Sequence, residues 1–455
     1  MANMLLEKYS KRIQLAESVY AKRHNGESMD SIRKITVAKC LDNVNKFLNE
    51  AFESSMGTQR SAMGDYKKFC IALTTVGLPN LIAFDLVAVS PMSSMYGNVA
   101  YIEYVKGTTK GESSVGDMVN SVWELGTPDP NYTGSMVVES ATGDGSTTEF
   151  DILFDQNSAL TKVTVDGSEV EIEVVESGTT VTAGKVAIVA KDGKNIVKFG
   201  TAPANAKAIK IAYVYDNVVI PQEKLPTLKA ELKNIGLEAK ARRIAVFYSQ
   251  MAAFQAKTDY GFDLADGLAE QAVGQLSYEI DTEICNMLID AADEYATLHP
   301  TGIANFSKTL PVGVNMADHY ASFAAKVEEL KQVLYMRTKK FVPNFMLAAA
   351  DIMPVLNFVP GFQAASVSDI NGPYFAGTFN GIKVYVTPNI ASGKFVLGVN
   401  QGAMQASAGV YAPYMPVVPT QLLGFADGGM SQGWSTMYDA KILNAALLVP
   451  SAIVA

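Results

Sequence analysis

Histidine and cysteine, on which most catalytic and metal sites depend, are scarce in this 455-residue sequence. No two histidines stand at a metal-binding spacing, and the cysteines form no CxxC pair, so neither a zinc site nor a disulfide framework is predicted. We expect reduced, buried thiols, as in a protein synthesised in a cytoplasm. His299, before Pro300, and His319, at a helix start, are expected to be structural. The residues concerned are His24, His299, His319, Cys40, Cys70 and Cys285.

Charge is also sparse, and positive charge is in deficit. Charged residues make up 18% of the chain, the net charge is −9 and the pI is about 5.1. This balance argues against a protein whose main surface binds phosphate backbones. Residues 1–50 are the exception, with nine Lys or Arg against six Asp or Glu. Two interpretations of this basic start stay open: a solvated helix pair, or an inward-facing arm near a nucleic acid or a scaffold.

No uninterrupted apolar run is long enough for a membrane helix. The longest candidate, residues 69–89, contains Pro79 and Asp85 and lacks flanking anchors. Charged residues also interrupt the first 25 positions, where a signal peptide would need an apolar stretch. We therefore predict no membrane span and no signal peptide.

Catalytic motifs are lacking too. There is no nucleophile elbow of the GxSxG type, and Gly143-Asp144-Gly145 precedes a predicted strand without the Lys-Ser/Thr ending of a phosphate loop, so a turn is predicted. Asp259, Asp263 and Asp266 could approach one another on a helix face, but acidic residues are common at helix starts and the spacing is not that of a calcium loop. The sequence therefore predicts no catalytic, cofactor-binding or metal-binding residue, and a protein that is not an enzyme.

The chain does have ample apolar material, 48% of its residues, enough for two or three compact units. Apolar residues recurring every three or four positions predict helices over 30–56, 263–295 and 317–338. The second would start behind Asp263 as N-cap and form a rod of about 48 Å, which favours a scaffold element over a catalytic-domain helix.

Strand patterns occupy much of the remainder. Short apolar strands are predicted over 69–105, broken at Pro79, Pro91 and Gly97. Residues 136–217 alternate apolar and polar residues and read as an inserted all-β module. Its Asp-Gly pairs, at 166–167 and 192–193, predict tight type I′ hairpins. Mixed strands and short helices are expected up to residue 400, followed by a β-rich tail.

Four blocks, in order along the chain, resemble segments of the major capsid proteins of T-even-like tailed bacteriophages (myoviruses). Two departures are Ser90 before Pro91-Met92 and Thr387, where the family usually has aspartate. The blocks are PNLIAFDLVAVSPMSSMYGNVAYIEY (79–104), the stretch from LKNIGLEAKARRIAVFYSQ to SYEIDTEI (232–284), GTFNGIKVYVTPNIASGKFVLGVNQG (377–402) and VYAPYMPVV (410–418).

The resemblance implies an α+β protein with the Hong Kong 97-type phage capsid fold. The extended loop of that fold would stay adaptable through Gly107, Gly111, Gly116 and Gly126. The implied parts are an N-terminal helical arm (1–60), the start of the peripheral domain (61–95), the extended loop (96–135), the inserted β-sandwich (136–217), the peripheral domain with its spine helix (218–344), the axial domain (345–405) and C-terminal strands returning to the peripheral domain (406–455).

The function implied is that of a major capsid (head) protein. Such a chain would self-assemble into hexamers, with pentamers left open, to form the icosahedral shell of a virion after synthesis in the bacterial host cytoplasm. Its partners would be scaffold, portal, vertex and decoration proteins, and packaged DNA on the inner face without sequence specificity. The alternatives are the related pentameric vertex protein and, from another class, a carbohydrate-binding adhesin acting through the β module.

The resemblance also raises proteolytic maturation, because proteases of such phages cut after a glutamate two residues past an aliphatic residue. Leu48-Asn49-Glu50 fits that pattern, as does Leu5-Leu6-Glu7. Cleavage would remove the basic arm. The alternative is that residues 1–50 are retained as an ordered helical arm.

Overall fold

The computed structural model divides the chain into two compact units. Unit 1 comprises residues 1–100 and 234–455, and unit 2 comprises residues 101–233, so the division falls inside strands β2 (Tyr96–Lys106) and β12 (Leu228–Glu238). The residues described are 2–23, 26–53, 74–75, 81–154, 158–175, 180–191, 194–218, 220, 222–261, 264–300, 302, 305–365, 372–420, 423–425 and 428–454.

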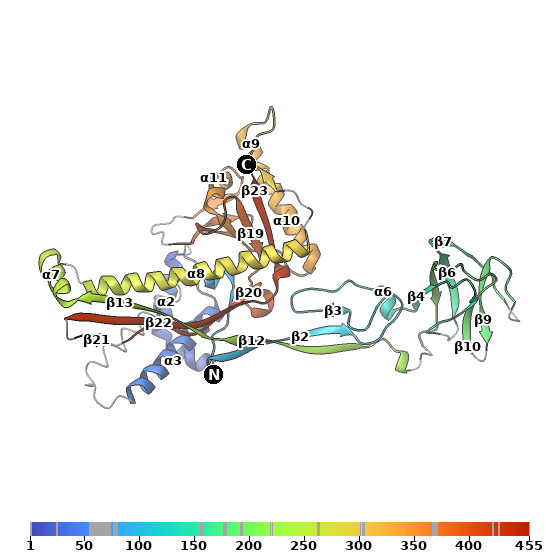
Figure 1. Ribbon diagram of the computed structural model, residues 1–455, viewed down its shortest axis with the longest axis horizontal. Helices are drawn as coiled ribbons and strands as arrows, with labels where there is room; N and C mark the ends of the chain where they lie inside the picture. The colour runs from blue at the N-terminus through green and yellow to red at the C-terminus, as the bar shows by residue number, and fades with distance from the viewer. Residues whose placement is uncertain are drawn as a thin grey trace. The chain divides into compact units, whose positions relative to one another are not determined.

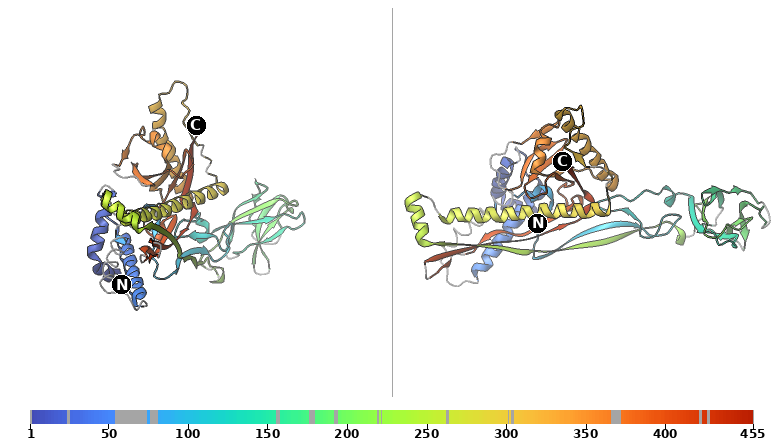
Figure 2. Two further views of the ribbon diagram at one scale, coloured as in Figure 1. Left: turned by 60° about the vertical axis from the view of Figure 1, so that its left-hand side comes forward. Right: turned by 45° about the horizontal axis from the view of Figure 1, so that its top comes forward.

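A five-stranded sheet and one long helix form the centre of unit 1 (Figure 1). Helix α8 (Leu264–Leu298) lies along the sheet, and Figure 2 shows the same arrangement from two further directions. Its 35 residues correspond to about 52 Å, so the predicted long helix is confirmed and runs one turn further. The sheet follows the order β1 (Ala88–Val89), β20 (Gly409–Pro419), β22 (Gly429–Ile442) and β13 (Lys240–Ser249), with β21 (Leu423–Gly424) paired to β22.

Helix α8 meets this sheet through the apolar stripe predicted from its period. Leu276 and Ala272 pack against the fully buried Trp434 of β22, flanked by Ile244 and Val246 of β13. The stripe continues through Ile280, Ile284 and Leu288, all buried, and ends on Ala292 instead of Ala291. Burial on this scale fixes the helix to the sheet as one rigid layer.

The opposite face of the sheet is covered by helix α3 (Ser31–Glu53). Val44 and Leu48 of α3 pack against Met415 and Val418 of β20. Met415 is paired with Met437, which alternation places on the face opposite Trp434. The predicted helix over 30–56 is confirmed up to Glu53; positions 54–56 lie outside the described residues. Helices α1 (Ala2–Lys8) and α2 (Ser10–Arg23) join α3 in a second apolar cluster.

Unit 1 also contains a seven-stranded sheet. Its strand β15 (Phe345–Ala349) is buried at every position. Phe323 of helix α10 packs edge-on against Phe395 of β19. The strands of this sheet follow the order β14 (Phe306–Ser307), β23 (Leu448–Val454), β19 (Lys394–Gly398), β15 (Phe345–Ala349), β18 (Ile382–Thr387), β17 (Tyr374–Phe379) and β16 (Phe362–Ala364). Beside it lie α9 (Met316–Ala321), α10 (Phe323–Thr338) and α11 (Met353–Leu356).

Three expectations need correction here. The single helix predicted over 317–338 is two helices, α9 and α10, because Ser322 bonds back to the carbonyl of His319 (2.6 Å) and interrupts the helical ladder. Strand β23 pairs with β19, so the tail 406–455 divides between the two sheets instead of returning as a whole to the first. Gly97 lies inside β2 and does not break it.

The predicted strands over 69–105 are also interrupted by a helical turn, α5 (Ala83–Leu86). The carboxylate of Asp281, on α8, accepts a hydrogen bond from the backbone N–H of Ala83 (3.2 Å). The N–H of Ala83 is one of the donors that the start of a helical turn leaves unpaired. Asp281, 198 positions further along the chain, therefore stabilises this turn.

Unit 2 contains two four-stranded sheets that share one core. Val163 and Ile209 from one sheet pack with Val186 and Val197 from the other. The first sheet runs β4 (Met136–Thr142), β11 (Ala208–Val214), β6 (Ala159–Val165) and β7 (Ser168–Glu169); the second runs β5 (Glu149–Asp151), β10 (Lys194–Phe199), β9 (Lys185–Lys191) and β8 (Glu171–Ile172).

The hairpin predicted at Asp166-Gly167 is confirmed, with φ of 52° and 80°. These positive angles are those of a type I′ turn, and the turn joins β6 to β7. The second Asp-Gly pair, at 192–193, lies outside the described residues.

Two buried lysines organise the segment that leads into these sheets. Lys110 donates to the carbonyls of Tyr132 (3.0 Å) and Gly134 (2.6 Å), and Lys106 donates to the hydroxyl of Ser113 (2.7 Å). The hydroxyl of Tyr132 in turn donates to the carbonyl of Thr227 (2.8 Å), so the entering and leaving chains are tied together. Also here are β3 (Met118–Asn120), paired with β2, and α6 (Pro130–Thr133).

Two glycines of this segment lie where the chain leaves no room for a side chain. A Cβ at Gly126 would overlap the carbonyl of Met118, and one at Gly107 would overlap the hydroxyl of Thr227. These glycines therefore allow close backbone packing. A Cβ at Gly116 would meet nothing within 4 Å, and the adaptability of the loop stays a prediction.

The packing of α8 generates a direct test. Leu276→Asp places a carboxylate in the apolar cluster around Trp434, so the free energy of unfolding should fall by about 4 kcal/mol or more. The matched control is Gln271→Asp, at an exposed position of the same helix. It should change the free energy of unfolding by less than about 0.5 kcal/mol. Urea unfolding followed by circular dichroism measures both, and equal stability of the two variants would contradict the assigned face.

Candidate functional site

The histidines with described side chains both have structural contacts. Nε2 of His319 lies 2.8 Å from the carbonyl oxygen of Ser307, and its ring stacks on Phe306. The ring of His299 packs against Tyr295. His24 lies outside the described residues. Neither described histidine faces a nucleophile, which is the arrangement that base catalysis needs.

The carboxylates considered as a cation site are not assembled into one. Asp259 is exposed at the end of helix α7 (Gln250–Tyr260), Asp263 lies outside the described residues, and the side chain of Asp266 is not described. Across the described part of the chain, no group of three or more His, Cys, Asp or Glu could hold a metal ion.

Asp144, in the glycine-flanked motif, is used in a turn, as predicted. Its carboxylate accepts hydrogen bonds from the backbone N–H groups of Ser146 (2.9 Å) and Thr147 (2.7 Å) and from the hydroxyl of Thr147 (2.6 Å). These bonds hold the pKa of Asp144 well below its usual range. The motif thus closes the connection into β5 and leaves no cradle for a phosphate.

The thiols of Cys40 and Cys285 are buried and unbonded, as predicted. Burial raises the pKa of Cys40 to about 12 and also raises that of Cys285, so both stay protonated and unreactive at neutral pH. Cys70 lies outside the described residues. Among the helices that the structure describes, none is long and apolar enough to cross a membrane.

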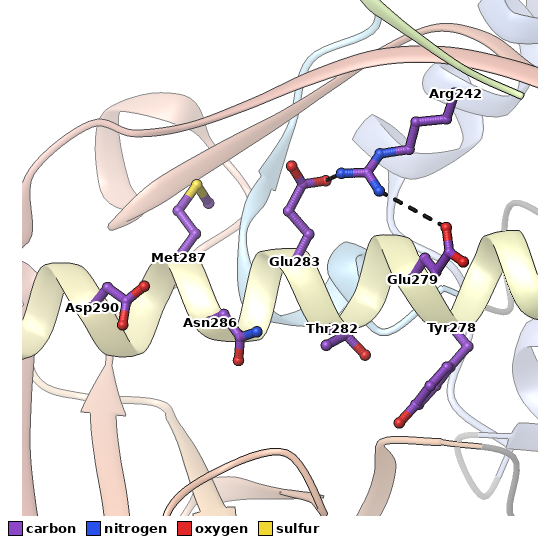
Figure 3. A pocket seen from close by; sticks show the side chains of 8 residues that line it. All are labelled: Arg242, Tyr278, Glu279, Thr282, Glu283, Asn286, Met287 and Asp290. Carbon is purple, nitrogen blue, oxygen red and sulfur yellow. Dashed lines mark ion pairs between the residues drawn. The ribbon is translucent and has the colours of Figure 1, made fainter.

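A surface depression of about 510 Å³ in unit 1 runs along α8 (Figure 3). Arg242 of β13 reaches down to Glu283 (2.5 Å) and Glu279 (4.0 Å), and the hydroxyl of Tyr438 donates to Glu283. The remaining lining residues are Tyr278, Thr282, Asn286, Met287 and Asp290. The groove is open, and two of its carboxylates, Glu279 and Glu283, are paired with Arg242.

The strongest electrostatic feature of unit 1 is instead a buried ion pair that ties α3 to α5. Arg33 lies 3.0 Å from the carboxylate of Asp85 and donates to the carbonyl of Phe84 (2.7 Å). The side chain of Asp85 is 3% exposed. Tyr20 of α2 donates to the same carboxylate (3.1 Å), and burial, followed by the charge of Asp85, raises the pKa of Tyr20 far above its usual value.

The sequence analysis did not find this pair. The available signal was Asp85, a single carboxylate inside the apolar run 81–89, which must be paired if the run is buried. Its partner, Arg33, is distant in sequence and stands among other basic residues, so the pairing could not be chosen from the sequence.

Further contacts attach the N-terminal helices to the rest of unit 1. The side-chain amide of Asn43 donates to the carbonyls of Met92 (2.9 Å) and Tyr414 (2.8 Å), and Lys39 donates to the carbonyl of Pro91 (2.9 Å). Four basic residues of this segment form ion pairs within unit 1: Lys8 and Lys46 with Asp42, Lys34 with Glu17 and Arg33 with Asp85. The helices thus pack on the body of unit 1, while Lys8 and Lys46 keep exposed side chains, so the two interpretations of the basic start stay open.

The family model described as "Major capsid protein Gp23" matches residues 63–442. Because this match covers most of the chain, the protein belongs to the Gp23 family of major capsid proteins. The α+β class predicted from the resemblance is confirmed. That α8 is the spine helix of the Hong Kong 97-type fold stays a prediction.

Several curated relatives are major capsid proteins. Those of Enterobacteria phages T6 and T4 are each 23% identical, over 75% of this chain and 71% and 68% of their own length. The protein of Vibrio phage KVP40 is 24% identical over 224 residues, which are 45% of this chain and 43% of that protein. In that last alignment the chain spans less than half of its relative.

Solved phage capsids are also similar, at low scores. The mature capsid of bacteriophage PhiM1 has a TM-score of 0.35 and 10% identity, covering 53% of this chain and 79% of that one. The capsid of Myoviridae phage XM1 has a TM-score of 0.34 and 6% identity, covering 69% and 88%. The family assignment rests on the family match and not on these scores.

The Arg33–Asp85 pair yields a second prediction. Arg33→Met should lower the free energy of unfolding by about 3–5 kcal/mol, because Asp85 would be left charged and buried without its cation. Lys46→Met, which removes a cation from the exposed pair with Asp42, is the control and should cost less than about 1 kcal/mol. Thermal and urea unfolding measure both losses. A loss at Arg33 no larger than at Lys46 would show that the buried pair does not hold the helices.

Proposed function

We propose that this protein assembles with copies of itself into the icosahedral shell that encloses the DNA genome of a tailed bacteriophage. The observation that carries the proposal is the family match over residues 63–442, which includes the first sheet, α8 and most of the seven-stranded sheet. The hexamer is the proposed building unit, and vertices built from pentamers of the same chain are left open.

The layered body of unit 1 supports such a role. A shell subunit must keep its shape under the pressure of a packed genome, and α8 with its sheet and α3 form a continuous packed body. Exposed strands and loops can add hydrogen bonds across subunit boundaries, which gives association without a deep pocket.

The division of labour along the chain is part of the proposal. Residues 1–60 are the N-terminal arm, 96–135 the extended loop toward a neighbour, 218–344 the peripheral domain and 345–405 the axial domain. The β module at 136–217 would lie on the outer face of the shell, because an insertion must avoid both the subunit contacts and the genome. Its ordered two-sheet core is consistent with independent folding.

Partners follow from the shell role. Scaffold, portal, vertex and decoration proteins would bind the assembled subunits in the virion, following synthesis in the host cytoplasm. DNA would touch the inner face without sequence specificity, since the chain is acidic overall and several of its N-terminal cations are paired within unit 1. The pentameric vertex protein of the family remains the second candidate, and counting copies per particle by electron microscopy separates the two.

Expression of the full chain tests the proposal. Negative-stain electron microscopy and analytical ultracentrifugation should show hexamers together with curved sheets, tubes or shells. A monodisperse monomer at every salt concentration, with and without a scaffold protein, would contradict it.

A further inference from the structure

Helix α7 exposes apolar side chains on every side. None of its eleven residues, Gln250–Tyr260, is buried. Met251 is 76% exposed, Phe254 68% and Tyr260 82%. Met251 and Phe254 stand three positions apart and so share one face of the helix. An isolated helix of this length is marginal in water, and packing of an apolar face normally stabilises it.

The adjoining strands extend this exposed apolar area at the same end of unit 1 (Figure 1). Phe247 of β13 is 69% exposed and Leu423 of β21 is 59% exposed. Both are paired with Ser431 of β22, so they lie on the same face of the sheet. We call Phe247, Met251, Phe254 and Tyr260 the α7 tip.

The exposed area is large enough to matter. An aromatic side chain buries roughly 150–250 Å² when covered, so three aromatics about 70% exposed offer roughly 300–500 Å² on one copy. Two such surfaces, with Met251 and Leu423 added, approach the roughly 1,200 Å² at which specific interfaces begin. Exposed apolar side chains gathered at one end of a unit are typical of a contact site.

The charge of the tip favours a second copy of the same chain. Lys257 and Asp259, both exposed on α7, carry opposite charges, so the helix has no net charge. The chain as a whole carries −9, and copies repel one another over most of their surface. A neutral apolar tip is where identical chains can approach without like-charge repulsion.

We propose that the α7 tip is a self-association surface that packs against the same tip of a neighbouring copy. This inference rests on the proposed shell function and names one contact that joins its building units. Helix α7 ends four residues before α8 begins. A contact made by the tip would therefore connect closely to α8 and the sheet on which α8 packs.

Paired charge substitutions test the tip. Met251→Glu with Phe254→Glu should leave the far-ultraviolet circular dichroism and the melting temperature unchanged, because neither side chain is buried. The fraction of protein that sediments as sheets or shells should fall about tenfold or more, since glutamates would face glutamates. The control adds the same charge at two exposed positions of unit 2, Val174→Glu with Val218→Glu, and should assemble like the parent.

Cross-linking tests the partner. In assembled Met251→Cys protein, a short bismaleimide should join chains into covalent dimers, whereas Val174→Cys and the parent chain should not give them. Efficient assembly of the tip variant overturns the inference and leaves the proposed function standing. Loss of assembly without dimers from Met251→Cys overturns the tip-to-tip contact. Failure of the parent chain to assemble at all contradicts the proposed function and this inference with it.

Discussion

The structure of unit 1 depends on one sheet being buried on both faces at once. Trp434 of β22 faces Leu276 of α8, while Met415 and Val418 of the neighbouring strand face Val44 and Leu48 of α3. Where α8 and α3 cover the sheet, neither helix can leave without exposing a row of apolar side chains to water. The start, the middle and the end of the chain therefore stabilise one another, although hundreds of residues separate them.

This constraint changes how the basic N-terminal segment is understood. A detachable arm would be held by few contacts and keep its charge for a partner. Here Leu48 packs against the sheet and is only 1% exposed, and Arg33 forms an ion pair with Asp85 within unit 1. Both glutamates that fit a maturation cut, Glu50 and Glu7, stand in helices, whereas a protease needs an extended and accessible strand of chain. Retention of residues 1–50 in the subunit stays a prediction.

Local patterns predicted much of this architecture, because they report burial directly. The four-residue step from Ala272 to Leu288 predicted α8, and the Asp166-Gly167 pair predicted its turn. What failed depended on distant partners: Asp281 caps the turn at Ala83, and β23 joins β19 instead of the first sheet. No residue of a catalytic kind was expected, and the described histidines and thiols have structural surroundings. The Arg33–Asp85 pair and the α7 tip were missed, since exposure and pairing arise only in the folded chain.

The central claim is that α3 and α8 hold one sheet between them in the assembled particle. Intact-mass spectrometry of subunits from mature particles tests it most directly. We predict a chain that begins at Met1 or Ala2, with a mass near 48.8 kDa. A subunit that begins at Ala51 would contradict the account, because it would lack most of α3 and expose the face of the sheet that Val44 and Leu48 cover.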